Sequence, residues 1–456
     1  MTRLRVDTAA DPLERLRAAG MVTLRHSHSG PGPYTPLTGL VSTGPGRPEV
    51  GDPGAACLGI DLGATMTRFQ LGTAAEGTAI PLVKVRYLTA GTPRAFLDQV
   101  SEVVSLARLV GLGAPAAVRV GAAGPVYGGG APTAVEVTNH PGWVLTDCLA
   151  RLRERTGCAD VHVVNDMAVG LDGPSAASWE RDAEPLRSPG GGHGLATGRR
   201  LKCQVGTGLN IAMVAADGGV HAFEYGHQPF PALTEQDHAL VRALSVLHRR
   251  RVVTFEDFLG GRGFGPLLLG YAALTAEPAR RSLPPGVREL LDTVSAHAGG
   301  DGPGTAATVP EEEIVRAVGE MDARTRELAA WFTGPGPEPS VRDRFARFGL
   351  WVLADFLRAG GRPAFAPVLA DHGRRLASFV LSAAQVTVCD EVYLGGRLVL
   401  DPLVRRGFLD AWDGLAEQFA HGHRLVDRVA VRVFPEPDYE LMLLREAAAA
   451  VEGARA

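Results

Sequence analysis

The chain has 456 residues, of which 45% are hydrophobic and 21% charged, enough apolar content for a large core and for two lobes. Its formal net charge is -4 and it has no sustained run of lysine and arginine, so a nucleic-acid partner is not expected. The sequence has no apolar stretch of about 18 residues and no hydrophobic signal segment at its start, so we expect a soluble, cytoplasmic protein without a membrane contact. The five cysteines are scattered without a CxxC pair and are expected to be reduced and buried.

Residues 1–54 are expected to form a largely irregular N-terminal extension, because one short helix candidate at 11–19 precedes a tract rich in glycine, proline, serine and threonine. From residue 55 to 170, apolar runs typical of strands alternate with helical periodicity. Strands are predicted at 56–60, 67–72, 118–123 and 161–165, and helices at 94–110 and 144–156. This alternation predicts an α/β lobe with a mixed or parallel sheet and helices on its faces.

A polar tract at 171–200, rich in glycine and proline, is expected to hold the connection to a second, mostly helical lobe. Strands are predicted at 201–205, 209–215, 220–225, 386–394 and 428–434. Helices are predicted at 235–249, 254–259, 287–297, 311–332, 341–359 and 374–384, with a last helix at 439–452.

Four small clusters of polar residues and glycines each follow a predicted strand, at 61–65, 164–166, 206–208 and 394–396. The first predicts a tight turn whose exposed backbone amides can hold phosphate oxygens. In it, Asp61 can orient a hydrated Mg²⁺, Gly63 permits close approach of the backbone, and the Thr65 hydroxyl can donate to phosphate. A plain hairpin turn is the alternative interpretation. Taken in order, the four clusters predict a two-lobed phosphotransferase.

The second cluster ends a buried apolar strand at 161–164, which is where α/β sheets present catalytic groups. Asp166 is therefore a candidate general base for a reaction that activates a hydroxyl group. The alternative is that Asn165 or Asp166 only caps the following helix, and the dipeptide alone does not separate the two interpretations.

Eight short motifs together resemble the bacterial glucokinase family, within the sugar kinase and actin superfamily, over roughly residues 56–450. The motifs are Leu58-Gly-Ile-Asp61-Leu-Gly-Ala-Thr65, Gly121-Ala-Ala-Gly124-Pro-Val, Thr138-Asn-His-Pro-Gly-Trp143, Val164-Asn-Asp166-Met-Ala, Gly206-Thr-Gly208-Leu, Glu224-Tyr-Gly-His227, Phe255-Glu256-Asp-Phe-Leu-Gly-Gly261 and Tyr393-Leu-Gly-Gly396. Each motif is weak alone, but their order and spacing are specific.

The resemblance implies an α/β fold of the two-lobed, actin-like and hexokinase-like ATPase type, with ribonuclease H-like mixed sheets and flanking helices. The small lobe would comprise residues 55–170 together with the C-terminal helix 438–456, and the large lobe residues 171–437. The implied activity is ATP-dependent phosphorylation of the primary hydroxyl of glucose or a closely related hexose, as in glycolysis, with ATP and Mg²⁺ as cofactors. The resemblance also allows a homodimer.

The same resemblance assigns roles to individual residues. It makes Asp166 the general base and implies a sugar-binding set of Asn165, Asp166, Glu224, His227 and Glu256. It implies nucleotide contacts at Asp61, Gly63, Thr65, Gly206, Thr207, Gly208, Gly395 and Gly396, with Asp61 holding Mg²⁺ through water. Hexose hydroxyls need both donors and acceptors, which carboxylate, amide and imidazole groups supply together.

Three of these roles have structural alternatives. Gly206, Thr207 and Gly208 also suit a plain hairpin turn, and Glu224 and His227 suit a solvated loop. Glu256 lies between Thr254 and Asp257, which resemble a capping box, and an acidic residue in a first helical turn is favoured by the helix dipole in any case.

Departures from the family pattern bear on the substrate. Tyr225 stands where the family commonly has a glycine, and its phenol is expected to narrow or reshape the sugar pocket. Asn210 also replaces a glycine, which we interpret as minor because asparagine tolerates left-handed φ. The cysteine-rich zinc motif of related repressors and kinases is missing, so no structural zinc is expected. These features keep two alternatives open: a kinase for a glucose-like cyclitol or amino sugar, and a sugar-sensing protein with little turnover.

Overall fold

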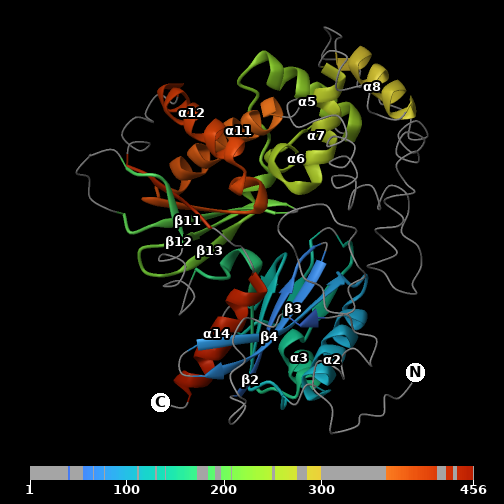
Figure 1. Cartoon of the computed structure of the whole chain (residues 1–456), viewed down its shortest axis with the longest axis vertical. Helices are drawn as coiled ribbons and strands as arrows, with labels where there is room; N and C mark the ends of the chain where they lie inside the picture. Colours follow the sequence, from blue (N-terminus) through green and yellow to red (C-terminus); the bar gives the residue numbers. More distant parts are fainter. Residues whose placement is uncertain are drawn as a thin grey trace. The chain divides into compact units, whose positions relative to one another are not determined.

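A computed structural model gives the structure of this chain (Figure 1). It describes residues 40–41, 55–64, 66–75, 78–109, 112–128, 131–138, 140–171, 183–189, 197–206, 208–248, 252–274, 285–298, 366–418, 428–434 and 439–454. The described residues divide into two compact units. The first contains those up to residue 171 together with 439–454, and the second those from 183 to 434.

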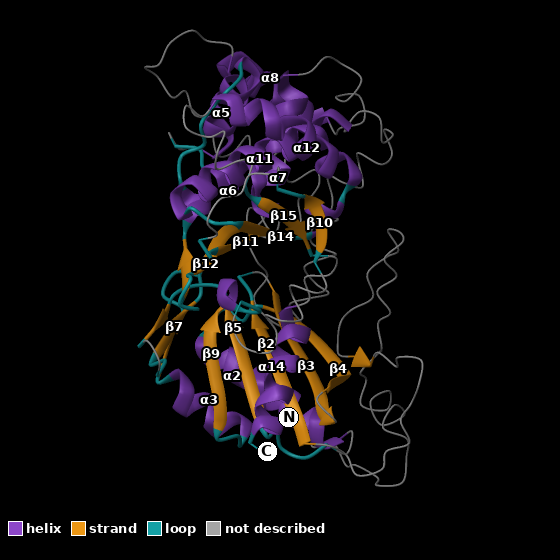
Figure 2. Ribbon diagram, turned by 90° about the vertical axis from the view of Figure 1, so that its left-hand side faces the viewer, coloured by secondary structure: helices purple, strands orange, loops and turns teal. Residues whose placement is uncertain are grey.

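The first unit is built on a six-stranded mixed sheet in the order β1-β4-β3-β2-β5-β9, most of which can be followed in Figure 2. Its strands are β1 (Leu40–Val41), β2 (Ala55–Leu62), β3 (Met66–Ala75), β4 (Thr78–Leu88), β5 (Ala117–Ala122) and β9 (Asp160–Asn165). β4, β3 and β2 form an antiparallel meander, while β5 and β9 run parallel to β2. A small antiparallel sheet consists of β6 (Val126–Tyr127), β7 (Ala134–Glu136) and β8 (Val144–Thr146).

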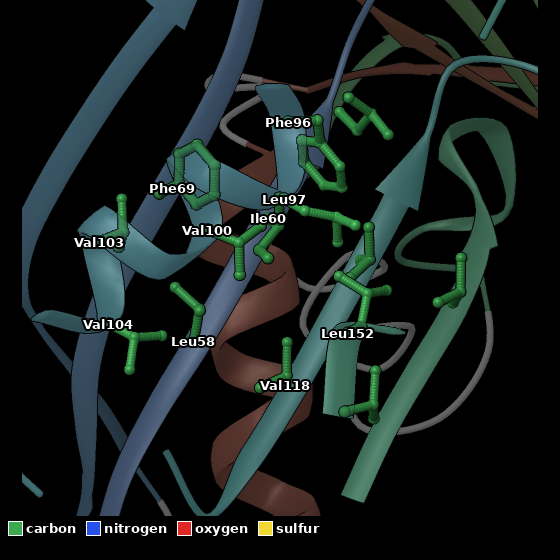
Figure 3. Packing of buried hydrophobic residues seen from close by; sticks show 14 of the residues in the cluster. Leu58, Ile60, Phe69, Phe96, Leu97, Val100, Val103, Val104, Val118 and Leu152 are labelled. Atoms are coloured by element: carbon green, nitrogen blue, oxygen red, sulfur yellow. The ribbon is translucent and has the colours of Figure 1, made fainter. Parts of the chain in front are cut away.

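Helices cover both faces of the first sheet, because β2 is apolar on both sides. Alternate side chains of a strand point to opposite faces, and Leu58 and Ile60 of β2 pack with α2 (Pro93–Leu109). Figure 3 shows these two residues on the same side of the sheet as Val100 and Val103 of α2. Cys57 belongs to a separate cluster with α14 (Tyr439–Gly453), which covers the other face. α3 (Cys148–Thr156) lies beside α2 (Figure 1).

The second unit repeats the strand pattern of the first. Its sheet has the order β10-β15-β14-β11-β12-β13, in which β11, β12 and β13 form an antiparallel meander and β14 and β15 run parallel to β11. The strands are β10 (Glu184–Arg187), β11 (Arg200–Val205), β12 (Leu209–Val214), β13 (Val220–Phe223), β14 (Glu391–Gly395) and β15 (Ala430–Val433). Its helices are α5 (Glu235–His248), α6 (Phe255–Leu259), α7 (Gly261–Leu274), α8 (Pro285–Ala298), α11 (Ala366–Thr387) and α12 (Pro402–Gln418).

Several predicted elements are corrected by the structure. The helix predicted from residue 144 begins at Cys148, because Val144–Thr146 forms β8. The strand predicted from residue 386 begins at Glu391, because α11 continues to Thr387. β4, α7 and α12 were not predicted. The predicted helices at 11–19, 311–332 and 341–359 lie outside the described residues, as does most of the expected extension, of which Leu40–Val41 pairs with β4.

A buried charge network joins the helices of the second unit. Asp237 of α5, which is 0% exposed, accepts hydrogen bonds from Arg374 Nη1 and Nη2 at 3.0 and 2.7 Å and from Arg375 Nε at 2.9 Å. Arg375 Nη1 also donates to the Tyr271 hydroxyl of α7, which donates to Asp371. Burial alone would raise the pKa of Asp237, but the hydrogen bonds and charges of the two arginines outweigh it and lower the pKa.

Two expectations about the whole chain can be compared with the described residues. All five cysteines are buried thiols, as predicted. Among the described helices, none is long and apolar enough to span a lipid bilayer.

Candidate active site

The first predicted phosphate turn joins β2 to β3. The Gly63 N–H donates to the Met66 carbonyl at 3.1 Å and closes a tight hairpin turn, as expected. A Cβ at Gly63 would lie 2.7 Å from that carbonyl oxygen, so the turn requires glycine. Thr65, the predicted phosphate donor, lies outside the described residues.

Asp61 lies at the carboxyl end of β2 with its side chain only 4% exposed, and its Oδ2 pairs with Arg68 Nη1 at 2.5 Å across the β2–β3 ladder. The carboxylate is the oxygen donor that Mg²⁺ prefers, and Mg²⁺ sites in kinases commonly use one or two carboxylates with the substrate phosphates. Within the described residues, no group of three or more acidic, histidine or cysteine side chains forms a metal site. A single carboxylate such as Asp61 matches a site of that kind, in which water and phosphate would supply the other ligands.

Side chains that the sequence did not single out donate hydrogen bonds to the backbone carbonyls of the β2–β3 turn. Thr89 Oγ1 donates to the Gly63 carbonyl at 2.5 Å, and the His140 Nε2–H donates to the Ala64 carbonyl at 2.7 Å. In the same loop, the Trp143 indole N–H donates to the Ala90 carbonyl at 2.8 Å. The only available signal was the motif at 138–143, which we used as a family marker without assigning it a role.

Asp166 and Asn165 lie at the same edge of the sheet as Asp61. β2, β5 and β9 run parallel, with Leu62 opposite Ala122 and Ala122 opposite Asn165. Strands spaced ~4.8 Å apart put the ends of β2 and β9 about 10 Å apart. Asp166 begins a short 3-10 helix, Asp166–Ala168, and its side chain is partly buried.

The capping interpretation holds for Asn165. Its Oδ1 accepts the Met167 N–H at 2.9 Å, and its Nδ2 donates to the Gly124 carbonyl at 2.7 Å. Asn165 thereby fixes the backbone on which Asp166 stands, and this cap does not use the Asp166 carboxylate.

In the second unit, the turn between β11 and β12 contains Gly206, whose N–H donates to the Gly208 carbonyl at 2.9 Å. The Gly261 N–H donates to the Gly206 carbonyl at 2.8 Å, so the start of α7 supports the turn. A Cβ at Gly208 would lie 2.8 Å from Glu256 Oε2, which excludes other residues without a shift of that carboxylate. Thr207 lies outside the described residues.

Glu256 faces this turn and is not the helix cap. The capping box of α6 is made by Thr254 and Asp257, with the Thr254 N–H donating to Asp257 Oδ2 at 2.8 Å. Glu256 Oε2 instead accepts the Leu209 N–H at 3.1 Å. The structure therefore brings a predicted sugar-binding carboxylate against the predicted second phosphate turn.

Glu224 and His227 form one exposed cluster with Asn210. Glu224 Oε2 accepts from Asn210 Nδ2 at 2.6 Å and lies 3.5 Å from His227 Nε2. Our explanation of Asn210 by left-handed φ is wrong, because Asn210 lies in the extended strand β12 and is not among the described residues with positive φ. Its side chain, rather than its backbone, distinguishes it from glycine.

The last predicted turn follows β14. A Cβ at Gly395 would lie 2.0 Å from Gln204 Oε1, and Gly396 has φ +123°, with its added Cβ 1.9 Å from the Val205 carbonyl. Gly395 is required because there is no space for a Cβ. Gly396 is required for the same reason and also because its φ is positive. Gln204, at the end of β11, is a further polar group at this turn that the sequence did not single out.

Tyr225 does not extend into the space near Glu224 and His227. Its hydroxyl bonds with Ser382 Oγ of α11 at 2.8 Å, and its ring packs on Phe255 and Phe379. The phenol is therefore partly buried against α6 and α11, and the expectation that it narrows or reshapes the sugar pocket stays a prediction.

Comparisons with known proteins indicate the family and the fold of this chain. The Glucokinase family model matches residues 58–309. The glucokinase of Balamuthia mandrillaris in complex with glucose is 17% identical, with a TM-score of 0.52 over 87% of this chain and 94% of that chain. A ROK family glucokinase from Streptomyces griseus, in complex with glucose and AMPPNP, is 18% identical, with a TM-score of 0.45 over 86% of this chain and 98% of that one. No curated protein matches the chain. The first of these structures confirms the predicted two-lobed, hexokinase-like fold.

Proposed function

The chain belongs to the glucokinase family, and on that premise we propose that it transfers the γ-phosphoryl group of ATP to the primary hydroxyl of glucose or a closely related hexose. The observation that carries the proposal is the position of Asp166 at the carboxyl end of β9, on a backbone fixed by Asn165 and at the same sheet edge as Asp61 and the Gly63 turn.

In this mechanism, Asp166 accepts the proton of the sugar hydroxyl as its oxygen attacks the γ-phosphorus, and the bond from phosphorus to the β–γ bridging oxygen breaks to release ADP. The Gly63 turn and the Gly206–Gly208 turn bind phosphate through backbone N–H groups other than those of Gly63 and Gly206, which close the turns themselves. Asp61 would hold the hydration shell of Mg²⁺, and that ion would neutralise charge on the phosphates of ATP.

Glu224, His227 and Glu256 bind the hydroxyls of the sugar ring. Carboxylates accept from hydroxyls, and a neutral imidazole can donate or accept. The adenosine lies against the backbone turn of Gly395 and Gly396 at the end of β14. Close packing on Gln204 and Val205 requires glycine at both positions and so keeps this turn free of side chains.

The test is Mg²⁺- and ATP-dependent ADP release against glucose, mannose, glucosamine, N-acetylated hexosamines and cyclitols. Selective turnover of glucose supports the proposal, and turnover of another ring alone assigns a specialised kinase. Binding of sugar without any turnover assigns a sensor instead.

Asp166→Asn tests the base. We expect kcat to fall about 100-fold or more with sugar binding largely preserved, the usual scale for loss of a general base. Asp160→Asn is the matched control, because Asp160 begins the same strand and pairs with Arg119 at the surface. Near-normal turnover of a folded Asp166→Asn variant would rule out the assigned role.

A further inference from the structure

The first two residues of β12 contact both carboxylates of the proposed sugar site in the second unit. The Leu209 N–H donates to Glu256, and the Asn210 side chain donates to Glu224. β12 is paired on both sides, with Asn210 opposite Gln204 of β11 and Ile211 opposite Phe223 of β13. The contacts therefore originate from a rigid strand rather than from a mobile loop.

Asn210 fixes the segment that carries Glu224 and His227 at two points. Its Nδ2 donates to Glu224 Oε2 at 2.6 Å, and its Oδ1 accepts the Gly226 N–H at 3.4 Å. Gly226 itself is tightly seated, since a Cβ there would lie 1.8 Å from the Leu209 carbonyl. One amide side chain thus holds both the backbone of the segment and its carboxylate.

The orientation of Glu224 depends on this contact because the carboxylate is otherwise exposed. The Glu224 side chain is 50% exposed, and the second group near its Oε2 is His227 at 3.5 Å, itself 53% exposed. An exposed glutamate samples several rotamers and loses entropy when a ligand orders it. With Oε2 occupied by Asn210, Oε1 accepts no hydrogen bond from the part of the chain that the structure describes and can accept one from a ligand.

We propose that Asn210 is a positioning residue that orients Glu224 to accept a hydrogen bond from one ring hydroxyl, and so sets the selectivity of the sugar site for a ring with a donor there. The inference rests on the proposed function. A glycine at this position, as the glucokinase resemblance would lead one to expect, offers Glu224 no such donor.

Two substitutions separate positioning from a structural role. Asn210→Gly removes the whole side chain. Asn210→Asp keeps its size and its acceptor for the Gly226 N–H, but replaces the donor to Glu224 with a like charge. Asp217→Ala is the matched control, because it removes a side-chain bond to a backbone N–H, that of Gly219 at 3.0 Å, between the other ends of β12 and β13.

For the sugar that the wild type phosphorylates best, we expect KM to rise about tenfold in Asn210→Gly and further in Asn210→Asp, the scale of a lost hydrogen bond to a charged group. The KM for ATP should stay at the wild-type value, and the thermal midpoint should fall by only a few degrees, because a glycine or a lost hydrogen bond in a strand costs about 1 kcal/mol. Asp217→Ala should leave both KM values unchanged. Deoxy analogues of the sugar identify the hydroxyl that Glu224 binds: the analogue without that hydroxyl is the one whose KM is not affected by Glu224→Gln. The KM of this analogue should also be unchanged in Asn210→Gly.

The outcomes are distinct. An active wild type whose sugar KM is unaltered by both Asn210 substitutions overturns the inference and leaves the proposed function intact, as does an equal rise of the KM values for sugar and ATP. A wild type that neither binds nor phosphorylates any sugar overturns the proposed function and the inference with it.

Discussion

Replacement of Asp237 by alanine should destabilise the second unit more than replacement of an acidic residue at the surface. Asp237 and Arg375 are both 0% exposed, and three hydrogen bonds of 2.7 to 3.0 Å join Asp237 to Arg374 and Arg375. Without the carboxylate, the Arg375 charge stays in the interior with the neutral Tyr271 hydroxyl at its Nη1 and with Asp371 Oδ2 3.9 Å from its Nη2. Removal of one member of a buried ion pair costs about 3–5 kcal/mol, so we expect a loss of that size.

The assay is urea unfolding followed by circular dichroism, comparing the midpoint of Asp237→Ala with that of Asp410→Ala. Asp410 pairs with Arg406 at 3.6 Å on the surface of α12, where the two side chains are 70% and 79% exposed, so its loss should cost at most about 1 kcal/mol. Equal midpoint shifts for the two variants would refute the reasoning, because they would mean that the Asp237 charge is solvated in the folded state.

The same network predicts an acid limit to stability. The folded-state pKa of Asp237 lies below its ordinary value of 3.8, so its contribution is fully present above that value and is lost as the pH falls through the folded-state pKa. The stability difference between wild type and Asp237→Asn should therefore be constant at neutral pH and shrink below about pH 3.8. A difference that grows on acidification would contradict the assigned sign.

Two further predictions concern the first turn and the cysteines. His140→Ala should raise the KM for ATP a few-fold and leave the KM for sugar unchanged, because it removes the hydrogen bond to the Ala64 carbonyl. In His140→Gln the side-chain amide can donate to the same carbonyl, so the KM for ATP should lie close to the wild-type value. Equal effects on the KM values of both substrates would argue against this role. The five cysteine thiols should react with Ellman's reagent only after denaturation, because all are buried and burial raises the pKa of Cys389 to about 11. Rapid reaction of any thiol in the native protein would contradict this prediction.

The strands that end at the proposed site were predictable because each has apolar residues in a continuous or an alternating run and is followed by polar residues or glycine. β2, β9, β11 and β14 have this pattern, and so the site edges could be found from the sequence. α7 could not be found, because Gly263 and Pro266 lie inside it and both disfavour a helix. Burial decides there: a Cβ at Gly263 would lie 2.1 Å from the Asp257 carbonyl, so tertiary contact overrides propensity.

The contacts between site residues were not predictable, since they depend on pairing register. Asn210 meets Glu224 because β12 and β13 pair in a hairpin, and the sequence gives no direct sign of which side chains face each other. The partner of Tyr225 was not predictable for a similar reason, because Ser382 lies on α11, distant in sequence. Roles that depend on neighbouring residues in the sequence could be predicted, whereas roles that depend on contacts between distant segments could not.

The return of α14 to the first sheet has a consequence for biosynthesis. Leu444 and Ala447 pack with Cys57 and Ala117, so one face of a sheet that ends at Asn165 is covered by a helix that begins at Tyr439. At about 5–20 residues per second, a ribosome needs roughly 14–55 s to make the intervening segment. During that time the nascent chain exposes an apolar surface of the kind that chaperones bind, and this surface is covered only after α14 emerges.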